Sequence, residues 1–277
     1  MRPTILLLAA ASCLSGAASF AALPANFVDE LVTATAGPTA IDFTPDGRLL
    51  VTRQGVSRFV LADNNTVDLA TETVLVDNMP STAGNHNAGD VQFGKDGNLY
   101  ITIGDGGCNY AGGGCQGTNN ASRDQFTLTG KVVRITKDGG IPTGNPFQGA
   151  GTTRCNVTGG TTAGNKCQET YSWGHRNPFR LAFDPNPAGT RFFINDVGEG
   201  SWEEIDLGQS GADFGWNCRE GAHTNGSFAS RVPTAPARSP PPPTSRRIWA
   251  AARRSTSASD RSAPPGRSTT PLSPAAA

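Results

Sequence analysis

Short apolar segments separated by tight turns recur along this chain, and their pattern predicts β-hairpins. Residues 41–51 and 91–101 each contain a short strand pattern, an Asp-Gly turn and a second apolar run, and residues 181–194 form a looser third copy. Asp-Gly between apolar runs favours a hairpin because both turn residues accept positive φ. Residues 131–136 have the pattern of a further strand, and no amphipathic helical stretch follows the N-terminal segment.

A hairpin unit that recurs at roughly 40–50 residues is typical of a β-propeller, in which neighbouring units bury each other's faces. The composition agrees, because 34 Gly, 20 Pro and only 17% charged residues suit many short strands and turns. We therefore predict an all-β propeller. An irregular β-sandwich whose Asp-Gly turns coincide is the alternative.

The N-terminal residues have the features of a secretory signal peptide. Arg2 supplies a positive charge, residues 5–8 and the Ala-rich stretch after them form a short apolar core, and small residues precede a cleavage position after Ala21. The apolar run is too short and too Ala-rich for a membrane span, and a lipid anchor at Cys13 is an alternative. We expect residues 1–21 to be removed and the mature chain to be secreted or periplasmic.

The segment 232–277 differs in kind from the patterned region 22–231. It contains four consecutive prolines, Pro240 to Pro243, and is rich in Arg, Ser and Ala. Because it has little apolar surface to bury, we expect a disordered tail, either a natural basic linker or, as we favour, out-of-frame translation. The formal net charge of +0 predicts no nucleic-acid partner.

Five cysteines follow the predicted cleavage position, and export would place them in an oxidising compartment. They are Cys108, Cys115, Cys155, Cys167 and Cys218. Two local loop disulfides, Cys108 with Cys115 and Cys155 with Cys167, are the simplest pairing and would leave Cys218 over. Sequence does not fix this connectivity, and a zinc site is the alternative.

Polar and ionisable residues concentrate in three loops beside the predicted strands. In a propeller such loops gather at one end of the central channel, so His86, Asp105 and Arg176 are expected to converge. The loops are residues 84–90, 104–107 and 173–178. A histidine can take a proton from a hydroxyl, a carboxylate can orient the imidazole, and an arginine can hold an electron-accepting group. This set suits oxidation of an alcohol by hydride transfer.

Each of these residues also has an ordinary structural interpretation. His86 in an Asn/Gly loop is a common turn residue, residues 104–107 form a tight turn, and Arg176 can make a surface ion pair. The sequence contains no Gly-x-Ser-x-Gly, no His-Glu-x-x-His and no dinucleotide-binding fingerprint. These absences argue against a serine hydrolase, a zincin and an NAD enzyme.

Five stretches, in order and spacing, resemble the glucose/sorbosone dehydrogenase family of pyrroloquinoline quinone (PQQ) enzymes. They are residues 38–52, 85–107, 130–147, 174–183 and 196–216. The resemblance runs from about Leu31 to Gly221. It implies a six-bladed β-propeller of the soluble quinoprotein glucose dehydrogenase type, of which about four blades are represented here.

The resemblance also assigns roles to individual residues. It places His86 on the general base, Asp105 on its supporting carboxylate, and Arg176 beside the quinone oxygens of PQQ. Asn177 falls on a neighbouring cofactor contact. Asn85 stands where glucose-oxidising members have an acid, which leaves the choice of sugar open.

Calcium is implied by the same resemblance. Gly198 falls near a backbone-carbonyl ligand of the ion beside the quinone, and Glu204 falls on a carboxylate of a more structural calcium site. Val197 stands where those members have an amide-bearing cofactor contact. The later blades, with the basic residues that hold the PQQ carboxylates, have no counterpart here, so we expect an open propeller that is unstable or inactive.

The function implied is PQQ-dependent oxidation of the C1 hydroxyl of aldose sugars to lactones, with an external electron acceptor. Two alternatives remain. One is a non-enzymatic extracellular binding propeller related to hedgehog-interacting proteins, and the other is a calcium-dependent lactonase-like propeller.

Overall fold

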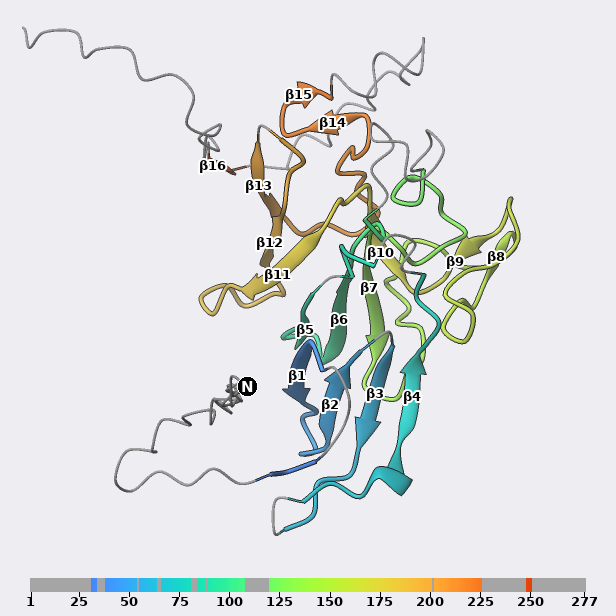
Figure 1. Ribbon diagram of the computed structural model, residues 1–277, viewed down its shortest axis with the longest axis vertical. Coiled ribbons are helices and arrows are strands. Elements are labelled where there is room, and N and C mark those ends of the chain that lie inside the picture. The colour runs from blue at the N-terminus through green and yellow to red at the C-terminus, as the bar shows by residue number, and fades with distance from the viewer. Residues whose placement is uncertain are drawn as a thin grey trace, which may run out of the picture.

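The computed structural model (Figure 1) describes residues 31–33, 38–53, 55–63, 66–80, 84–87, 89–107, 120–200, 202–225 and 248–250. These residues are nearly all strand and loop, with one short 3-10 helix, η1 (Leu69–Thr71). The prediction of an all-β protein is therefore confirmed. Within the described residues no helix has the length and apolar character needed to span a membrane. The predicted signal peptide, Cys13, Cys108, Cys115 and most of the predicted tail lie outside the described residues.

The first repeat copy forms a hairpin in a four-stranded antiparallel sheet with the order β1-β2-β3-β4. Its strands are β1 (Ala40–Phe43), β2 (Leu49–Thr52), β3 (Val56–Phe59) and β4 (Thr73–Val76). Gly47, in the turn between β1 and β2, has a φ of 80°. Asp46 does not have positive φ, so this turn needs one left-handed residue and not the two that we expected, and glycine adopts that conformation without steric cost.

The second repeat copy forms the hairpin β5–β6 of a sheet with the order β10-β7-β6-β5. Its strands are β5 (Val91–Phe93), β6 (Asn98–Ile103), β7 (Lys131–Thr136) and β10 (Thr170–Trp173). The strand predicted at residues 131–136 is β7, which pairs with both β6 and β10. The repeat in the sequence therefore corresponds to equivalent hairpins in two separate sheets.

The third copy forms β11–β12 of a sheet with the order β11-β12-β13-β16. Its strands are β11 (Pro178–Phe183), β12 (Phe192–Asp196), β13 (Glu203–Leu207) and β16 (Ile248–Ala250). Residues 248–250, within the segment 232–277, form β16 in the structure. Ile248 pairs with Ile205, so the backbone of this short apolar segment satisfies hydrogen-bonding groups along the edge of β13.

Two small ladders complete the described structure. Strand β8 (Thr152–Thr153) pairs with β9 (Lys166–Cys167), and β14 (Arg219–Glu220) pairs with β15 (His223–Thr224). Figure 1 shows the first ladder beside β10 and the second near the end of β13. The second ladder borders the loops that form the candidate site.

The second sheet lies between the other two and is buried on both faces (Figure 1). On β6, Ile101 packs in a cluster with Leu50 of the first sheet. Its neighbour Tyr100 packs instead with Phe192 of the third sheet, with the ring centroids 5.0 Å apart. Successive side chains of a strand point to opposite faces, so one strand contributes to both cores.

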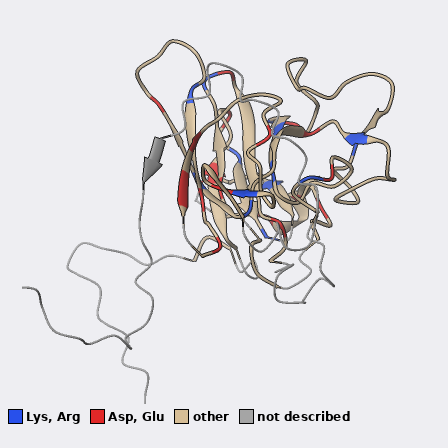
Figure 2. Ribbon diagram, turned by 90° about the horizontal axis from the view of Figure 1, so that it is seen from above, with Lys and Arg blue, Asp and Glu red and all other residues tan. Residues whose placement is uncertain are grey.

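The first sheet, in contrast, leaves apolar side chains exposed. Ile41 and Phe43 on β1 are 62% and 51% exposed. Across the described residues the sheets do not close into a ring, so the six-bladed architecture remains a prediction. Basic and acidic residues are both scattered over the described ribbon (Figure 2). Arg58 forms an ion pair with Asp138 at 2.5 Å.

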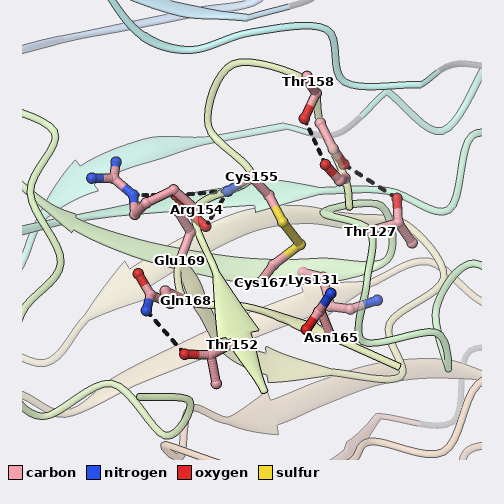
Figure 3. Close-up of a disulfide and its surroundings, with 12 residues drawn as sticks. Thr127, Lys131, Thr152, Arg154, Cys155, Thr158, Asn165, Cys167, Gln168 and Glu169 are labelled. Carbon is pink, nitrogen blue, oxygen red and sulfur yellow. Dashed lines mark hydrogen bonds and ion pairs between the residues drawn. A yellow bond between two sulfur atoms is a disulfide. The ribbon is translucent and has the colours of Figure 1, made fainter. Parts of the chain in front are cut away.

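Cys155 and Cys167 form a disulfide, with 5.4 Å between their Cα atoms (Figure 3). This is one of the two pairings that the spacing suggested, and it removes both residues from the zinc alternative. The buried carboxylate of Glu169 accepts the N–H of Cys155 and pairs with Arg154 at 2.7 Å. Cys218 is a buried free thiol, and its burial raises its pKa.

Candidate active site

The loop before β5 holds His86 in an unusual backbone conformation. His86 has a φ of 50°, in the left-handed region that side chains other than glycine rarely adopt. The loop after β6 approaches it closely, because a Cβ at Gly104 would lie 2.0 Å from the carbonyl oxygen of His86. Residues 104–107 are therefore more than a turn: their glycines let two loops from distant parts of the sequence pack backbone to backbone.

Asp105 fixes the imidazole of His86. The Nδ1 atom of His86 lies 2.8 Å from Oδ1 of Asp105, which also accepts the N–H of Gly107 at 2.9 Å. Asp105 is 2% exposed, whereas the His86 side chain is 17% exposed. An ionised carboxylate only accepts hydrogen bonds, so the His86 proton belongs on Nδ1. The Nε2 atom is then an unprotonated base, and no described residue bonds to it.

Arg176 is joined directly to this pair through the backbone. Its carbonyl oxygen accepts the N–H of Asp105 at 2.8 Å, and its own N–H donates to Asp196 at 3.0 Å. Its guanidinium donates to the carbonyl of Val197 at 3.0 Å. The structure thus brings together His86, Asp105 and Arg176, which the sequence predicted to converge.

Asn177 and Asn85 lie at the edges of the same site. The N–H of Asn177 donates to Asp196 at 2.7 Å, while its buried Oδ1 has no hydrogen-bond partner among the described residues. Asn85 is exposed, and its Oδ1 lies so close to Gly107 that a Cβ there would be 1.2 Å away. A buried polar atom without a hydrogen bond costs free energy. The Oδ1 of Asn177 is therefore expected to accept a hydrogen bond from a ligand.

A small cavity of about 10 Å³, with room for one water-sized atom, lies beside Arg176. Its lining includes Gly198, Glu204 and Trp216, so both predicted calcium residues face the same space as the arginine. Glu204 accepts the N–H of Gly221. Carboxylate oxygens of the kind that calcium prefers line the cavity at Asp196, Glu204 and Glu220, together with the cations Arg176 and Arg219. The Arg176 guanidinium fits an anionic or quinone group, and the unpartnered Oδ1 of Asn177 fits a hydrogen-bond donor of a ligand.

A second His–Asp pair, His175 with Asp196, is buried next to the loop of Arg176. His175 is fully buried; its Nδ1 lies 3.3 Å from Asp196, and its Nε2 lies 3.0 Å from Oγ of Ser172. Its ring stacks on Phe214 with centroids 4.6 Å apart. Ligand atoms of His175, Asp196 and Asp206 lie within 4.8 Å of one another. Asp196 already accepts the backbone N–H groups of residues 176 and 177, so this cluster supports the arginine loop from inside.

The sequence model of the family described as Glucose / Sorbosone dehydrogenase matches residues 52–252. This is most of the chain and includes every residue of the site. The chain belongs to this family. The match also extends through β16, beyond the boundary at residue 231 that the composition suggested.

Individual members of the glucose/sorbosone dehydrogenase family resemble this chain over part of their length. The HIPL2 protein of Arabidopsis thaliana is 31% identical over 153 residues, which cover 50% of this chain and 19% of that protein. The quinoprotein glucose dehydrogenase B of Acinetobacter calcoaceticus is 31% identical over 173 residues, which cover 59% and 32% respectively. The chain thus matches about a fifth to a third of the length of these curated relatives.

The fold is shared with solved structures of sugar dehydrogenases. The PQQ-bound form of aldose sugar dehydrogenase from Streptomyces coelicolor aligns with a TM-score of 0.51 and 24% identity. The alignment covers 71% of this chain and 54% of that one. The three sheets described here therefore follow the architecture of that dehydrogenase fold.

Two residues that sequence reasoning gave no role support the site in this family member. Trp216 donates its indole N–H to Oδ2 of Asp105 at 2.8 Å. Lys131, fully buried on β7, donates through Nζ to the carbonyls of Ala121, Ser122 and Thr129 at 2.7–3.1 Å. Burial lowers the pKa of Lys131 to about 7. The role of Trp216 could not be read from the sequence, because Asp105 lies 111 residues away.

Proposed function

We propose that this chain contributes the catalytic pole of a PQQ-dependent sugar dehydrogenase. The reaction is oxidation of the C1 hydroxyl of an aldose to a lactone. The observation that carries the proposal is the convergence of an open imidazole nitrogen, a buried carboxylate and a guanidinium from three separate loops. Membership of the glucose/sorbosone dehydrogenase family supports it.

His86 is the general base of the proposed reaction. Its Nε2 accepts the proton of the C1 hydroxyl, and the negative charge of Asp105 stabilises the imidazolium that forms. When bound, PQQ would accept the two electrons and the hydrogen of the C1–H bond, with calcium polarising it as a Lewis acid. The C1 carbon then forms its carbonyl, and an external electron acceptor would restore the oxidised cofactor.

Arg176 and Asn177 would hold the cofactor, and the residues of the adjoining pocket would hold calcium. The guanidinium offers a planar set of donors for quinone or carboxylate oxygens, and the Oδ1 of Asn177 would accept a hydrogen bond from a donor of the bound group. The carbonyl of Gly198 is proposed for the ion near the quinone and the carboxylate of Glu204 for a structural ion. Asn85, which is exposed next to His86 in the sequence, would contact the sugar.

The wider organisation remains part of the proposal. Residues 1–21 would direct export to the periplasm or the exterior, and residues 22–231 would form about four blades of a six-bladed propeller. The segment 232–277 would be a tail apart from β16. The similarity to the HIPL2 protein favours one alternative, a propeller that binds a partner without catalysis.

Direct binding and turnover measurements test the proposal. Recombinant chain is mixed with PQQ and CaCl₂; cofactor binding is followed by quenching of tryptophan fluorescence, and dye reduction is followed with a panel of aldoses. We expect PQQ to bind, with sugar-dependent dye reduction. Arg176→Gln should weaken PQQ binding by about 10-fold to 100-fold, the effect of one charge-assisted hydrogen bond.

Arg191→Gln is the matched control, because Arg191 is 52% exposed and pairs only with Asp184 among the described residues. It should bind PQQ like the unmodified chain. If the chain binds no PQQ, or if both Arg variants bind it equally well, the dehydrogenase proposal is wrong. PQQ binding without dye reduction by any aldose would refute the proposed oxidation of sugars.

A further inference from the structure

Trp216 touches both halves of the candidate active site. Its indole N–H donates to Oδ2 of Asp105 at 2.8 Å, across 111 residues of sequence. The guanidinium carbon of Arg176 lies 5.3 Å from the centroid of its ring. The side chain is 5% exposed, so both contacts are formed away from bulk solvent. One aromatic side chain therefore links the carboxylate that orients the base to the cation proposed for the cofactor.

The backbone of Trp216 forms hydrogen bonds to two other loops, through its N–H and through its carbonyl. Its N–H donates to the carbonyl of Gly174 at 2.9 Å, and its carbonyl accepts the hydroxyl of Ser122 at 2.9 Å. Ser122 is in turn fixed by the ammonium of Lys131, which donates to its carbonyl at 3.1 Å. The indole is thus fixed in position before any ligand binds.

The direction of the indole hydrogen bond matters for the base. Asp105 Oδ1 already receives the N–H of Gly107 and faces Nδ1 of His86, and Trp216 holds the opposite oxygen. Because an indole nitrogen can only donate, it keeps Oδ2 an acceptor and prevents the carboxylate from turning. A carboxylate in one orientation selects the His86 tautomer with the proton on Nδ1 and leaves Nε2 available.

We propose that Trp216 is a positioning residue that holds the Asp105 carboxylate through its indole N–H and so sets the tautomer of His86. The inference rests on the proposed function only for its effect on turnover, since the tautomer exists in the protein without cofactor. The ring of Trp216 also supports Arg176, and this second contact does not need the N–H. A Trp216→Phe variant separates the two contacts, because it keeps a ring and removes the donor.

The test is ¹⁵N NMR of histidine side chains in the cofactor-free full chain. With three histidines in the chain, a His86→Asn variant assigns the His86 signals by their loss. We expect the Nδ1–H tautomer in the unmodified protein and a mixture of both tautomers in Trp216→Phe. Trp173→Phe is the control: that ring packs against Phe147 with centroids 5.4 Å apart, and its loss should leave the tautomer unchanged.

Turnover adds a second readout in the PQQ-loaded protein. Trp216→Phe should lower kcat about 10-fold to 100-fold with little change in KM for the sugar, because misplacing a catalytic group affects the chemical step. An unchanged His86 tautomer in Trp216→Phe overturns the inference, whatever the turnover. Absence of PQQ-dependent turnover in the unmodified chain refutes the proposed function instead, and leaves the tautomer result to decide the role of Trp216.

A measurement on the intact tryptophan covers the case in which Trp216→Phe does not fold. The indole N–H signal of Trp216 is assigned by elimination with Phe variants of the other tryptophans, Trp173, Trp202 and Trp249. This signal should exchange slowly with solvent and should move in Asp105→Asn but stay in place in Asp184→Asn. Rapid exchange, or a signal that ignores Asp105→Asn, overturns the inference.

Discussion

The protein contains two histidine–aspartate pairs that have the same chemistry and different surroundings. His86 pairs with Asp105 at 2.8 Å, and His175 pairs with Asp196 at 3.3 Å. The outer imidazole is partly exposed and its Nε2 bonds to no described residue, whereas the inner imidazole is fully buried and its Nε2 is bonded to Ser172. A His–Asp pair alone is therefore not enough for a general base. The imidazole Nε2 must also be accessible to the group that it deprotonates.

The two pairs are coupled through one glycine. The N–H of Gly130 donates to the carbonyl of Gly104, next to Asp105, and its carbonyl accepts the N–H of His175 at 3.2 Å. The inner pair therefore supports the loop on which the outer pair depends. We expect substitutions in the outer pair to affect turnover and substitutions in the inner pair to affect folding.

The largest expected effect is on turnover, in His86→Asn. Asparagine tolerates positive φ and can still donate to Asp105, so the loop should keep its shape while the base is lost. Turnover with PQQ and an aldose should fall about 1,000-fold, the contribution of a general base. Urea unfolding should change by less than about 1 kcal/mol. Retained turnover would show that His86 is not the base.

Gly130→Ala should disturb both His–Asp pairs, because Gly130 is hydrogen-bonded to the loops that carry them. Gly130 has a φ of 68°, and a Cβ there would lie 2.5 Å from the Cα of Ser122. We expect a loss of about 3 kcal/mol in unfolding free energy, from strain and from backbone contacts that cannot move away. Gly149→Ala is the control, since it shares the positive φ with no atom in the way. An equal loss of unfolding free energy in both variants would show that the close approach of Gly130 to Ser122 does not matter for stability.

His175→Asn repeats the first substitution in the inner pair. It removes the bond to Ser172 and the stack on Phe214, and it leaves a small cavity. The free energy of unfolding should fall by about 2 kcal/mol in urea titrations. His223→Asn, at the exposed third histidine, should change it by less than about 0.5 kcal/mol. A His175→Asn variant as stable as the unmodified chain would contradict a structural role for the inner pair.

The smallest expected effect is the pH dependence of stability that Lys131 causes. Lys131 is fully buried and donates to the carbonyl of Ser122. Its pKa in the folded protein is about 7, lowered by burial, whereas an unfolded lysine titrates near 10.4. Between these values the unfolded chain binds more protons, so stability should rise with pH, by about 1 kcal/mol from pH 7 to pH 8. Urea unfolding at the two values measures it. Lys131→Met should lose this rise, and a fall in stability with pH would refute the assignment.

The hairpins could be predicted from the sequence because their signals are local. Asp46-Gly47 and Asp96-Gly97 require only that adjacent residues accept the turn, and the structure has positive φ at Gly47 and Gly97. The convergence of His86, Asp105 and Arg176 was also predictable, since repeated strands place equivalent loops at one end. These inferences needed no knowledge of which side chains touch.

Other features could not be predicted because they depend on contacts between distant segments. Strand β16 looked like part of a disordered tail, and only the free edge of β13 gives it a partner. Trp216 lies in one of the stretches that carry the family resemblance, and nothing near it in the sequence points to Asp105. The number of blades and the contact of the Trp216 ring with Arg176 also depend on how distant segments pack, so the sequence did not predict them.

By itself the sequence determined the strand pattern, the turns and the chemical types of the site residues, because side-chain alternation and backbone preference act over a few residues. Only the tertiary structure decided which of the two paired histidines, His86 or His175, has a ring nitrogen that bonds to no described residue. Burial and hydrogen-bond partners come from loops that meet in space, and they distinguish two His–Asp pairs made of the same residue types.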